Sequence, residues 1–464
     1  MINSIRASLE TCRFISRFAL TELLVKIPLM PLSWSEFVAH RRRLPLQYFP
    51  AAGATRTIAI CSHIWWTEQI GLALFNAGFN VAFLQPFYLF YTDKYAWDNF
   101  DVCWQEHRQV FRDARVDLLL GGNDSALAVH PRTGERIHHG IRPDGSPIPV
   151  VNWWWDDLRV RPALARSGLS PAEYVRVLGD PFTLNAIWDI DVLEELNAQL
   201  FLGNLFHLPL ATLPEYWARE YVPIENRAHA ACFLGICHSD ASWTQTDPGP
   251  LATWARRIVS GKIASPGTPM QRLIEEASGR DRAFCNDPKL NTGDAWAAFM
   301  RPWEILNTTY MHRTRNQMVI AAKRHLNEKF LLVGEGWGAV GLQSAGEFAG
   351  EQSGDIYANS QACLNLFGGC VHGGLPLRPY DIGASGGLIL THMQRELPNL
   401  LVPGEECLTF QSAEEMLDHL DRVHASPREF DRIAQAGQRR VLAEHTWQHR
   451  IEALVAELQR RGLF

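Results

Sequence analysis

The sequence lacks several features that usually reveal where and how a protein works. No apolar run approaches the length of about 18 residues that a membrane-spanning helix needs. The nine cysteines form no C-x-x-C pair, so no zinc or disulfide framework is indicated and a reducing, cytoplasmic compartment is expected. The pairs His138–His139 and Cys232–Cys237 lack supporting ligands at metal-site spacing, so no metal site is expected.

Two phosphate-binding patterns are also missing. No G-x-G-x-x-G follows the first predicted strand, and no G-x-x-x-x-G-K-[ST] occurs, which argues against a dinucleotide fingerprint and a P-loop. We also expect no nucleophile elbow of the α/β-hydrolase kind. The formal net charge of -6 argues against a protein that binds nucleic acid mainly through phosphate contacts.

The residues that are present are typical of a globular protein with two domains. The 464 residues exceed the size of one ordinary core, and 47% of them are hydrophobic while 20% are charged. The 16 tryptophans and 23 phenylalanines are numerous, and several stand near the ends of predicted strands. Aromatic faces can stack there on a sugar ring, and core packing explains them about as well.

Residues 1–50 form an N-terminal extension that we predict to be helical. Within residues 1–30, Ile5, Leu9, Ile15 and Leu23 fall along one side of such a helix. Charged residues interrupt the apolar run, which argues against a signal peptide. We expect the helix to pack on the first domain, and contact with a membrane surface or a partner is the alternative.

Residues 51–225 alternate short apolar runs with helical patterns, which predicts a parallel sheet covered by helices. Strands are expected at 55–62, 80–86, 116–122 and 147–157, and helices at 67–79 and 104–115. A helix at 185–200 and a short strand at 205–211 complete this domain.

Residues 226–445 repeat this organisation, so a second domain of the same kind is predicted. Strands are expected at 231–235 and 330–334, a helix with or without a short strand at 353–367, and a helix followed by a strand at 377–391. A further strand, a Ser N-cap and a helix follow at 405–426. The last segment, 446–464, is predicted to be a helix that packs back on the first domain.

Candidate ligand-binding residues gather in the second domain. A nucleotide diphosphate needs backbone N–H groups and an Arg or Lys, a ribose needs a carboxylate, and glycine lets the backbone approach both. The stretch GGLPLRPYDIGASGGLILT supplies all three, although a capped helix that runs into a strand would have the same composition. The candidates are Gly235, Arg313, Gly334, Gly336, Arg378, Asp381, Gly386 and Gly387.

A catalytic base is expected where strands of the first domain end. His63 follows the first strand, and its ring can titrate near neutral pH. Asp156 and Asp157 end the fourth strand, where a helix N-cap is the alternative role. If a phosphate of the bound nucleotide takes up the proton instead, none of these residues is needed.

These motifs, taken in order, resemble the GT-B glycosyltransferases. The match is closest to the CgeB-like (spore maturation protein) branch, whose C-terminal domain is of the glycosyl transferases group 1 type. The matching segments are AICSHIWWTEQIGLALFNAGFNVAFL, VDLLL, IPVVNWWWDD, AIWDIDVLEEL, LLVGEGW, DIYANSQACLNLF, LPLRPYDIGASGGLILT, LVPGEECLTFQSAEEMLDHL and HTWQHRIEAL. The resemblance implies two Rossmann-like domains, an N-terminal acceptor domain and a C-terminal donor domain.

The resemblance also implies an activity and roles for two residues. It implies a bacterial, metal-independent hexosyltransferase that uses a UDP-, GDP- or TDP-sugar as co-substrate, with no resident cofactor and a saccharide, protein or small molecule as acceptor. Asp381 matches the acidic residue that binds the donor ribose, but is one methylene shorter, and Arg378 matches an arginine placed near the phosphates. A nucleotide-sugar epimerase and a catalytically silent binding subunit remain alternatives.

Overall fold

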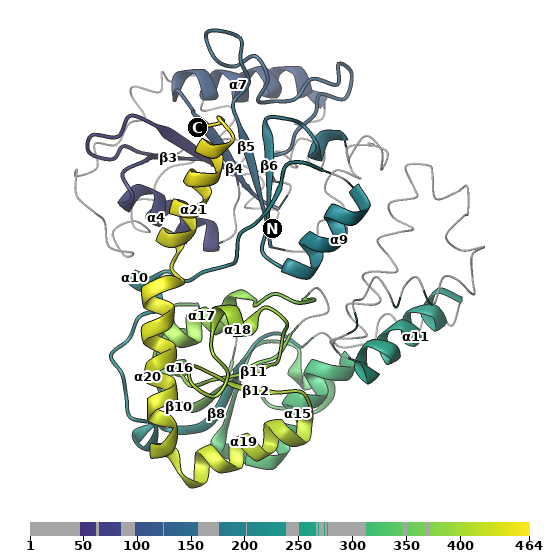
Figure 1. The fold of residues 1–464 in the computed structure, drawn as a ribbon, viewed down its shortest axis with the longest axis vertical. Helices are drawn as coiled ribbons and strands as arrows, with labels where there is room; N and C mark the ends of the chain where they lie inside the picture. Colours follow the sequence, from purple (N-terminus) through teal and green to yellow (C-terminus); the bar gives the residue numbers. More distant parts are fainter. Residues whose placement is uncertain are drawn as a thin grey trace.

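The protein consists of two α/β domains stacked along the long axis of the molecule (Figure 1). The computed structural model describes residues 47–61, 65–84, 98–123, 125–155, 176–200, 202–237, 250–265, 312–346, 350–367 and 371–464, with isolated positions at 268, 273 and 276. The predicted extension therefore lies outside the described residues except for its last four positions. No helix within the described part is long and apolar enough to cross a membrane.

The N-terminal domain is built on a seven-stranded sheet with the order β1-β3-β2-β4-β5-β6-β7. All its pairs are parallel except β1, which pairs antiparallel with β3 at the edge. Every residue of the strands β2, β4, β5 and β6 is buried, as expected for parallel strands with both faces covered. The strands are β1 Gln47–Phe49, β2 Thr57–Cys61, β3 Asn80–Leu84, β4 Leu118–Gly122, β5 Val150–Trp154, β6 Thr183–Ile187 and β7 Leu205–His207, and the helices are α4 Trp65–Asn76, α7 Phe100–Asp113, α9 Ile190–Leu200 and α10 Pro214–Trp217.

The C-terminal domain is built on a five-stranded, fully parallel sheet with the order β12-β11-β10-β8-β9. One of its helices, α19, begins with the predicted cap, since the Ser412 side chain accepts from the Glu415 N–H at 3.2 Å. The strands are β8 His229–Leu234, β9 Phe330–Val333, β10 Ser360–Asn365, β11 Ile389–His392 and β12 Leu408–Phe410, and the helices are α11 Pro250–Ala264, α15 Gln317–Leu326, α16 Ser353–Ala358, α17 Leu377–Ala384, α18 Leu397–Leu400, α19 Ala413–Ala425, α20 Pro427–Glu444 and α21 Trp447–Arg460.

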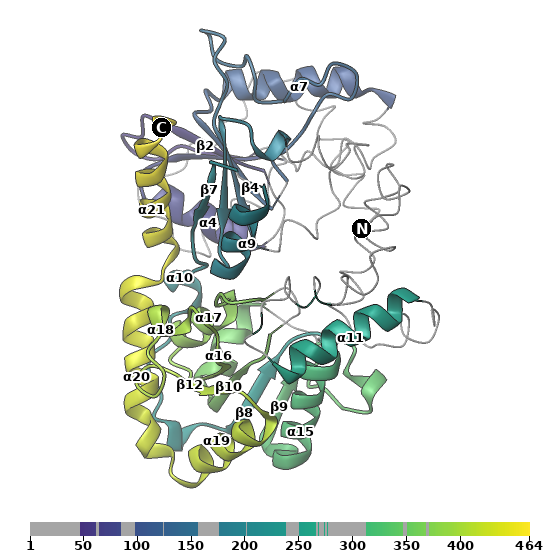
Figure 2. The same ribbon diagram turned by 45° about the vertical axis from the view of Figure 1, so that its right-hand side comes forward.

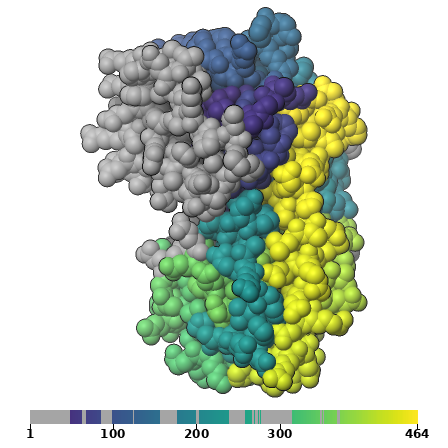
Figure 3. Space-filling model, turned by 90° about the vertical axis from the view of Figure 1, so that its left-hand side faces the viewer, coloured from purple at the N-terminus to yellow at the C-terminus, as the bar shows by residue number. Residues whose placement is uncertain are grey.

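The chain crosses between the domains twice, and the two crossings are bonded to each other. The Thr212 N–H donates to the His445 carbonyl at 3.0 Å, and the Trp447 N–H donates to the Thr212 carbonyl at 2.9 Å. Beyond this point α21 leaves the C-terminal domain and packs against α4 of the N-terminal domain. The space-filling view shows the two last helices, in yellow, running along both domains (Figure 3).

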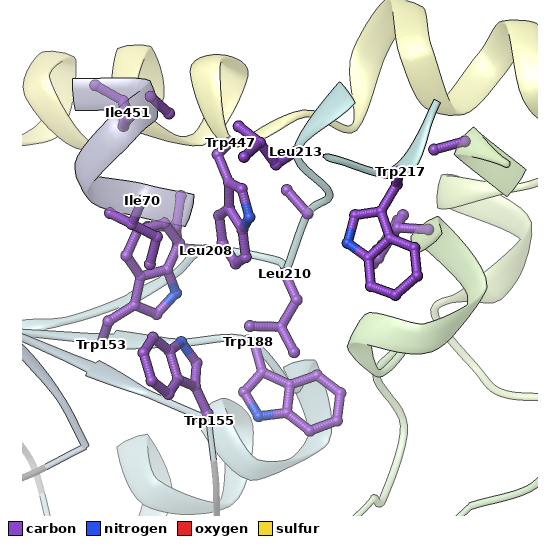
Figure 4. Close-up of a cluster of buried hydrophobic side chains, with 14 of the residues drawn as sticks. Ile70, Trp153, Trp155, Trp188, Leu208, Leu210, Leu213, Trp217, Trp447 and Ile451 are labelled. Carbon is purple, nitrogen blue, oxygen red and sulfur yellow. The ribbon is translucent and has the colours of Figure 1, made fainter. Parts of the chain in front are cut away.

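A core of aromatic and aliphatic side chains continues from one domain into the other beside these crossings (Figure 4). Trp447, at the start of α21, is 1% exposed and lies edge-on to Trp153 of β5, with ring centroids 5.3 Å apart. Its indole N–H donates to the buried Gln69 side chain of α4 at 3.2 Å. Burial of this size makes α21 a structural part of the N-terminal domain.

The prediction of a helix over residues 185–200 is wrong for its first residues. Residues Thr183–Ile187 form the buried strand β6 between β5 and β7, and the helix α9 begins only at Ile190. The segment is short and apolar, and its place between two strands overrides its helical pattern. The antiparallel edge strand β1 was not predicted.

Candidate functional site

Parallel sheets bind ligands at the edge where the carboxyl ends of their strands lie, and each of the two sheets has such an edge. The two edges meet where Asp189, two residues beyond β6, accepts from the N–H groups of His372 and Gly373, which follow β10. In Figure 2, α9 lies on the side of the upper domain that faces the lower one.

Three predicted glycines lie together at the carboxyl edge of the C-terminal sheet. Gly235 follows β8, and its N–H donates to the Val333 carbonyl at 2.9 Å. Gly334 has a φ of 131°, and a Cβ there would lie 2.2 Å from the Gly235 oxygen. Gly336 has a φ of 82°, and a Cβ there would lie 2.4 Å from the Cys237 oxygen. Glycine is therefore required by backbone conformation and by the close packing of the two loops.

Two arginines reach this edge from different helices and share one aromatic ring. The guanidinium of Arg378, in the first turn of α17, lies 5.5 Å from the Phe233 ring centroid, and that of Arg315 lies 5.9 Å from it. Arg378 Nη2 is also 3.6 Å from the position of a Cβ on Gly235. Arg315 donates to the Ile236 carbonyl and is buried. Within the described part of the chain, no hydrogen bond or ion pair engages the Arg378 guanidinium.

Asp381 lies one helical turn after Arg378 and is enclosed at the domain crossing. Asp381 is 4% exposed, and its Oδ1 accepts from the Thr212 hydroxyl at 2.8 Å. Burial raises the pKa of this carboxyl well above its usual range, while the Thr212 hydroxyl and the Arg378 charge act in the opposite direction. In this conformation the carboxylate therefore connects α17 to the interdomain segment.

Gly386 and Gly387 lie at the opposite edge of the sheet from Gly235, so they do not line the same site. They follow the last turn of α17 and precede β11, and the Gly386 carbonyl accepts from the Arg227 guanidinium at 2.8 Å. Gly386 has a φ of 76°, and a Cβ on Gly387 would lie 2.8 Å from the Ile382 side chain. Both glycines end the helix and let it pack closely on the strand that follows.

Ser385 lies in a stretch, residues 383–387, that matches the G-x-S-x-G pattern of hydrolase elbows. A nucleophile elbow runs from strand to helix, whereas this stretch runs from the helix α17 to the strand β11. The Ser385 hydroxyl is buried, with the Trp217 and Asp381 carbonyls at 2.9 and 2.8 Å. The pattern therefore reflects packing in this protein.

The predicted catalytic residues His63, Asp156 and Asp157 lie outside the described residues, as does the side chain of Arg313. The strands before them are described: β2 ends at Cys61 and β5 at Trp154, on either side of β4. Their assignment as bases remains a prediction.

Sequence reasoning missed Arg315 and Asp189. Arg315 lies two positions beyond the predicted Arg313, in a π-helical turn over His312–Asn316 whose register no sequence pattern indicated. Asp189 was missed because part of the strand that precedes it, β6, was predicted to be helix. The sequence signal that could have indicated Asp189 is an acidic residue that closely follows a short apolar strand.

One further group of residues has ligand types that suit a metal. The side chains of His138, His139 and Asp180 offer ligand atoms within 4.8 Å of one another. However, the Arg136 guanidinium already pairs with Asp180 Oδ2. Desolvation, and with it the charge of Arg136, lowers the pKa of His138 and of His139, and the same positive charge would repel an added cation.

Part of the chain is similar to a known protein family. Residues 313–456 match the family model described as Glycosyl transferase-like. No curated protein matches the chain. The two parallel sheets, one in each domain, and the helix α21, which returns to the first domain, give the architecture of a GT-B protein.

Solved structures with similar folds cover most of the chain at low sequence identity. A sucrose-phosphate synthase from Thermosynechococcus elongatus has 11% identity and a TM-score of 0.48, over 87% of this chain and 98% of its own. A glycosyltransferase from Rickettsia africae has 7% identity and a TM-score of 0.45, over 88% and 99%. Anabaena HepE in complex with UDP-glucose has 8% identity and a TM-score of 0.45, over 87% and 99%.

Proposed function

We propose that the protein is a glycosyltransferase that moves a sugar from a nucleotide-sugar donor to an acceptor hydroxyl. The match of residues 313–456 to a Glycosyl transferase-like family supports this, since those residues include most of the C-terminal domain. Membership of the CgeB-like branch, hexosyl transfer, independence of metal and a bacterial, cytoplasmic setting are finer parts of the proposal. They rest on the sequence resemblance.

The observation that carries the proposal is the Arg378 guanidinium beside a glycine-lined backbone. A Cβ on Gly235 would lie 3.6 Å from Arg378 Nη2, and Gly334 and Gly336 let the loop after β9 pack closely on the backbone that follows β8. A guanidinium that forms no ion pair with a described carboxylate, at the carboxyl edge of a parallel sheet, suits the diphosphate of a nucleotide sugar.

Sugar transfer breaks the bond between the anomeric carbon and the diphosphate oxygen while the acceptor oxygen bonds to that carbon. The diphosphate leaves with an added negative charge, and Arg378 would stabilise that charge more in the transition state than in the bound donor. An acceptor attacking from the N-terminal domain would lose its proton to His63, Asp156 or Asp157, or to the donor itself.

The ribose assignment of Asp381 carries a condition. Asp381 is only 4% exposed and its Oδ1 already accepts from the Thr212 hydroxyl, so a ribose hydroxyl could reach this carboxylate only if the surrounding residues moved. We therefore assign the phosphates to Arg378 first and keep the ribose on Asp381 as a separate prediction.

The test is a thermal-shift titration of the whole protein with UDP, GDP, TDP and ADP, repeated on Arg378→Ala. Arg422→Ala is the matched control, because Arg422 also lies over a phenylalanine ring, 5.9 Å from that of Phe430, but on α19. We expect one nucleotide to raise the melting temperature of the wild type and of Arg422→Ala, and a much smaller rise for Arg378→Ala. An equal rise in all three proteins would refute the assignment of Arg378.

Incubation with UDP-GlcNAc in the absence of acceptor tests the epimerase alternative. A transferase leaves the sugar unchanged or slowly hydrolyses it. Accumulation of an isomeric nucleotide sugar would overturn the transferase proposal.

A further inference from the structure

The contact between the facing edges of the two sheets is built around one buried carboxylate, that of Asp189. This residue is 1% exposed and follows β6 of the N-terminal domain. Its Oδ2 accepts from the backbone N–H groups of His372 at 2.8 Å and Gly373 at 3.1 Å, both in the C-terminal domain. Its Oδ1 accepts from the N–H groups of Asp191 at 3.0 Å and Val192 at 3.3 Å, at the start of α9, and also from the Gly373 N–H at 3.1 Å.

The bonds from the N–H groups of His372 and Gly373 show that Asp189 is more than a helix cap. A cap needs one acceptor, and Oδ1 fills that need for α9. A charged carboxylate is costly to bury unless most of its lone pairs are satisfied. Among the described residues, Oδ2 accepts only from the other domain, so separation of the domains would leave it without those partners.

Two glycines in the C-terminal domain are explained by the same contact. A Cβ on Gly373 would lie 2.3 Å from the Asp191 carboxylate, and a Cβ on Gly374 would lie 2.8 Å from the Asp189 Cα. Neither glycine has the positive φ that would require it. What forbids a side chain at these positions is therefore the closeness of the other domain.

Ion pairs extend the contact along the same side of the molecule. Arg395, beyond β11, pairs with Asp191 at 2.5 Å and with Glu194 at 2.9 Å, and Glu396 pairs with His207 of β7 at 2.9 Å. The contact thus joins the β6–β7 side of one sheet to the β10–β11 side of the other. The ends of β2, β4 and β5, and those of β8 and β9, do not take part in these bonds.

We propose that Asp189 is a positioning residue that sets how closely the two domains approach each other at their ligand-binding edges. It does so by holding the backbone of His372 and Gly373. The loop it holds leads directly into α17, which carries Arg378. The consequence for donor binding rests on the proposed function, whereas the control of domain spacing does not.

The test is amide hydrogen exchange on Asp189→Asn, measured in the full-length protein by mass spectrometry. The amide oxygen of asparagine can still cap α9 and accept from the Gly373 N–H, but its NH2 group would face the His372 N–H and cannot accept from it. We expect the peptide containing residues 371–376 to exchange at least about tenfold faster, with the start of α9 unchanged. Asp117→Asn is the control, since the Asp117 carboxylate accepts from the Thr57 N–H at 2.8 Å inside one domain.

Gly374→Ala provides a second, independent perturbation. It keeps Asp189 but places a methyl group where the domains touch, so it should accelerate the same peptide selectively. Unchanged exchange of residues 371–376 in both variants would overturn the proposal. Equal acceleration at α9 in Asp189→Asn would also overturn it, because Asp189 would then support its own domain alone. If no nucleotide bound the wild type, the proposed function would fail while the exchange result would still stand.

Discussion

Removal of the Trp447 side chain should weaken the attachment of α21 to the N-terminal domain. Trp447 is 1% exposed, lies edge-on to Trp153, and donates its indole N–H to Gln69, which is fully buried. Truncation of a buried tryptophan to alanine costs about 3–5 kcal/mol in free energy of unfolding. Trp447→Phe keeps most of the ring contacts and leaves the Gln69 carbonyl without this donor, so it should cost about 1–3 kcal/mol.

Urea unfolding followed by tryptophan fluorescence and far-ultraviolet circular dichroism would measure both losses. We expect Trp447→Ala to separate one cooperative transition into two, because the only helix that returns to the N-terminal domain in the described structure would be released. Trp337→Ala is the control: Trp337 is also 1% exposed, edge-on to Phe233 and hydrogen-bonded, but inside one domain. A loss below about 1 kcal/mol for Trp447→Ala, or the same separation in Trp337→Ala, would refute the reasoning.

Two other predictions follow from the candidate site. Burial raises the pKa of Asp381 above the ordinary 3.8, so the folded state binds a proton that the unfolded state releases, and stability falls as the pH rises from about 3.8 toward the raised pKa. Asp381→Asn has no carboxyl to ionise, so its free energy of unfolding relative to wild type should be larger at pH 7 than at pH 4. Urea titrations at the two pH values measure this difference, and a smaller relative stability at pH 7 would contradict the assignment. Gly334→Ala forces a side chain onto a φ of 131° and against the Gly235 oxygen, and should cost more than about 1 kcal/mol, whereas Gly338→Ala, with open space at its Cβ, should cost less.

Much of the fold could be predicted from the sequence because the buried parallel strands are short apolar runs between turn residues. The exception is the segment Thr183–Ile187, which also fits a helical pattern. Pairing with the neighbouring strands β5 and β7 makes it a strand. Periodicity cannot supply that information for a segment of this length.

The candidate site was harder to predict, because the sequence does not show which edge of a sheet a residue occupies. Arg378 and Gly387 lie nine positions apart in one motif, yet α17 carries the chain from one edge of the sheet to the other between them. The enclosure of Asp381 depends on Thr212, which is 169 positions away in the sequence. Contacts of this separation leave no local pattern, and the same holds for Asp189 and Gly373.

The measurement that tests the central claim most directly is the nucleotide titration of the wild type and Arg378→Ala. A ligand at about one hundred times its dissociation constant stabilises the folded state by about 2.7 kcal/mol, which is a readily measured rise in melting temperature. The account predicts such a rise with one of UDP, GDP or TDP, its near loss in Arg378→Ala, and its retention in Arg422→Ala. If none of the nucleotides shifts the wild type, the protein does not bind a nucleotide-sugar donor at this site and the account is contradicted.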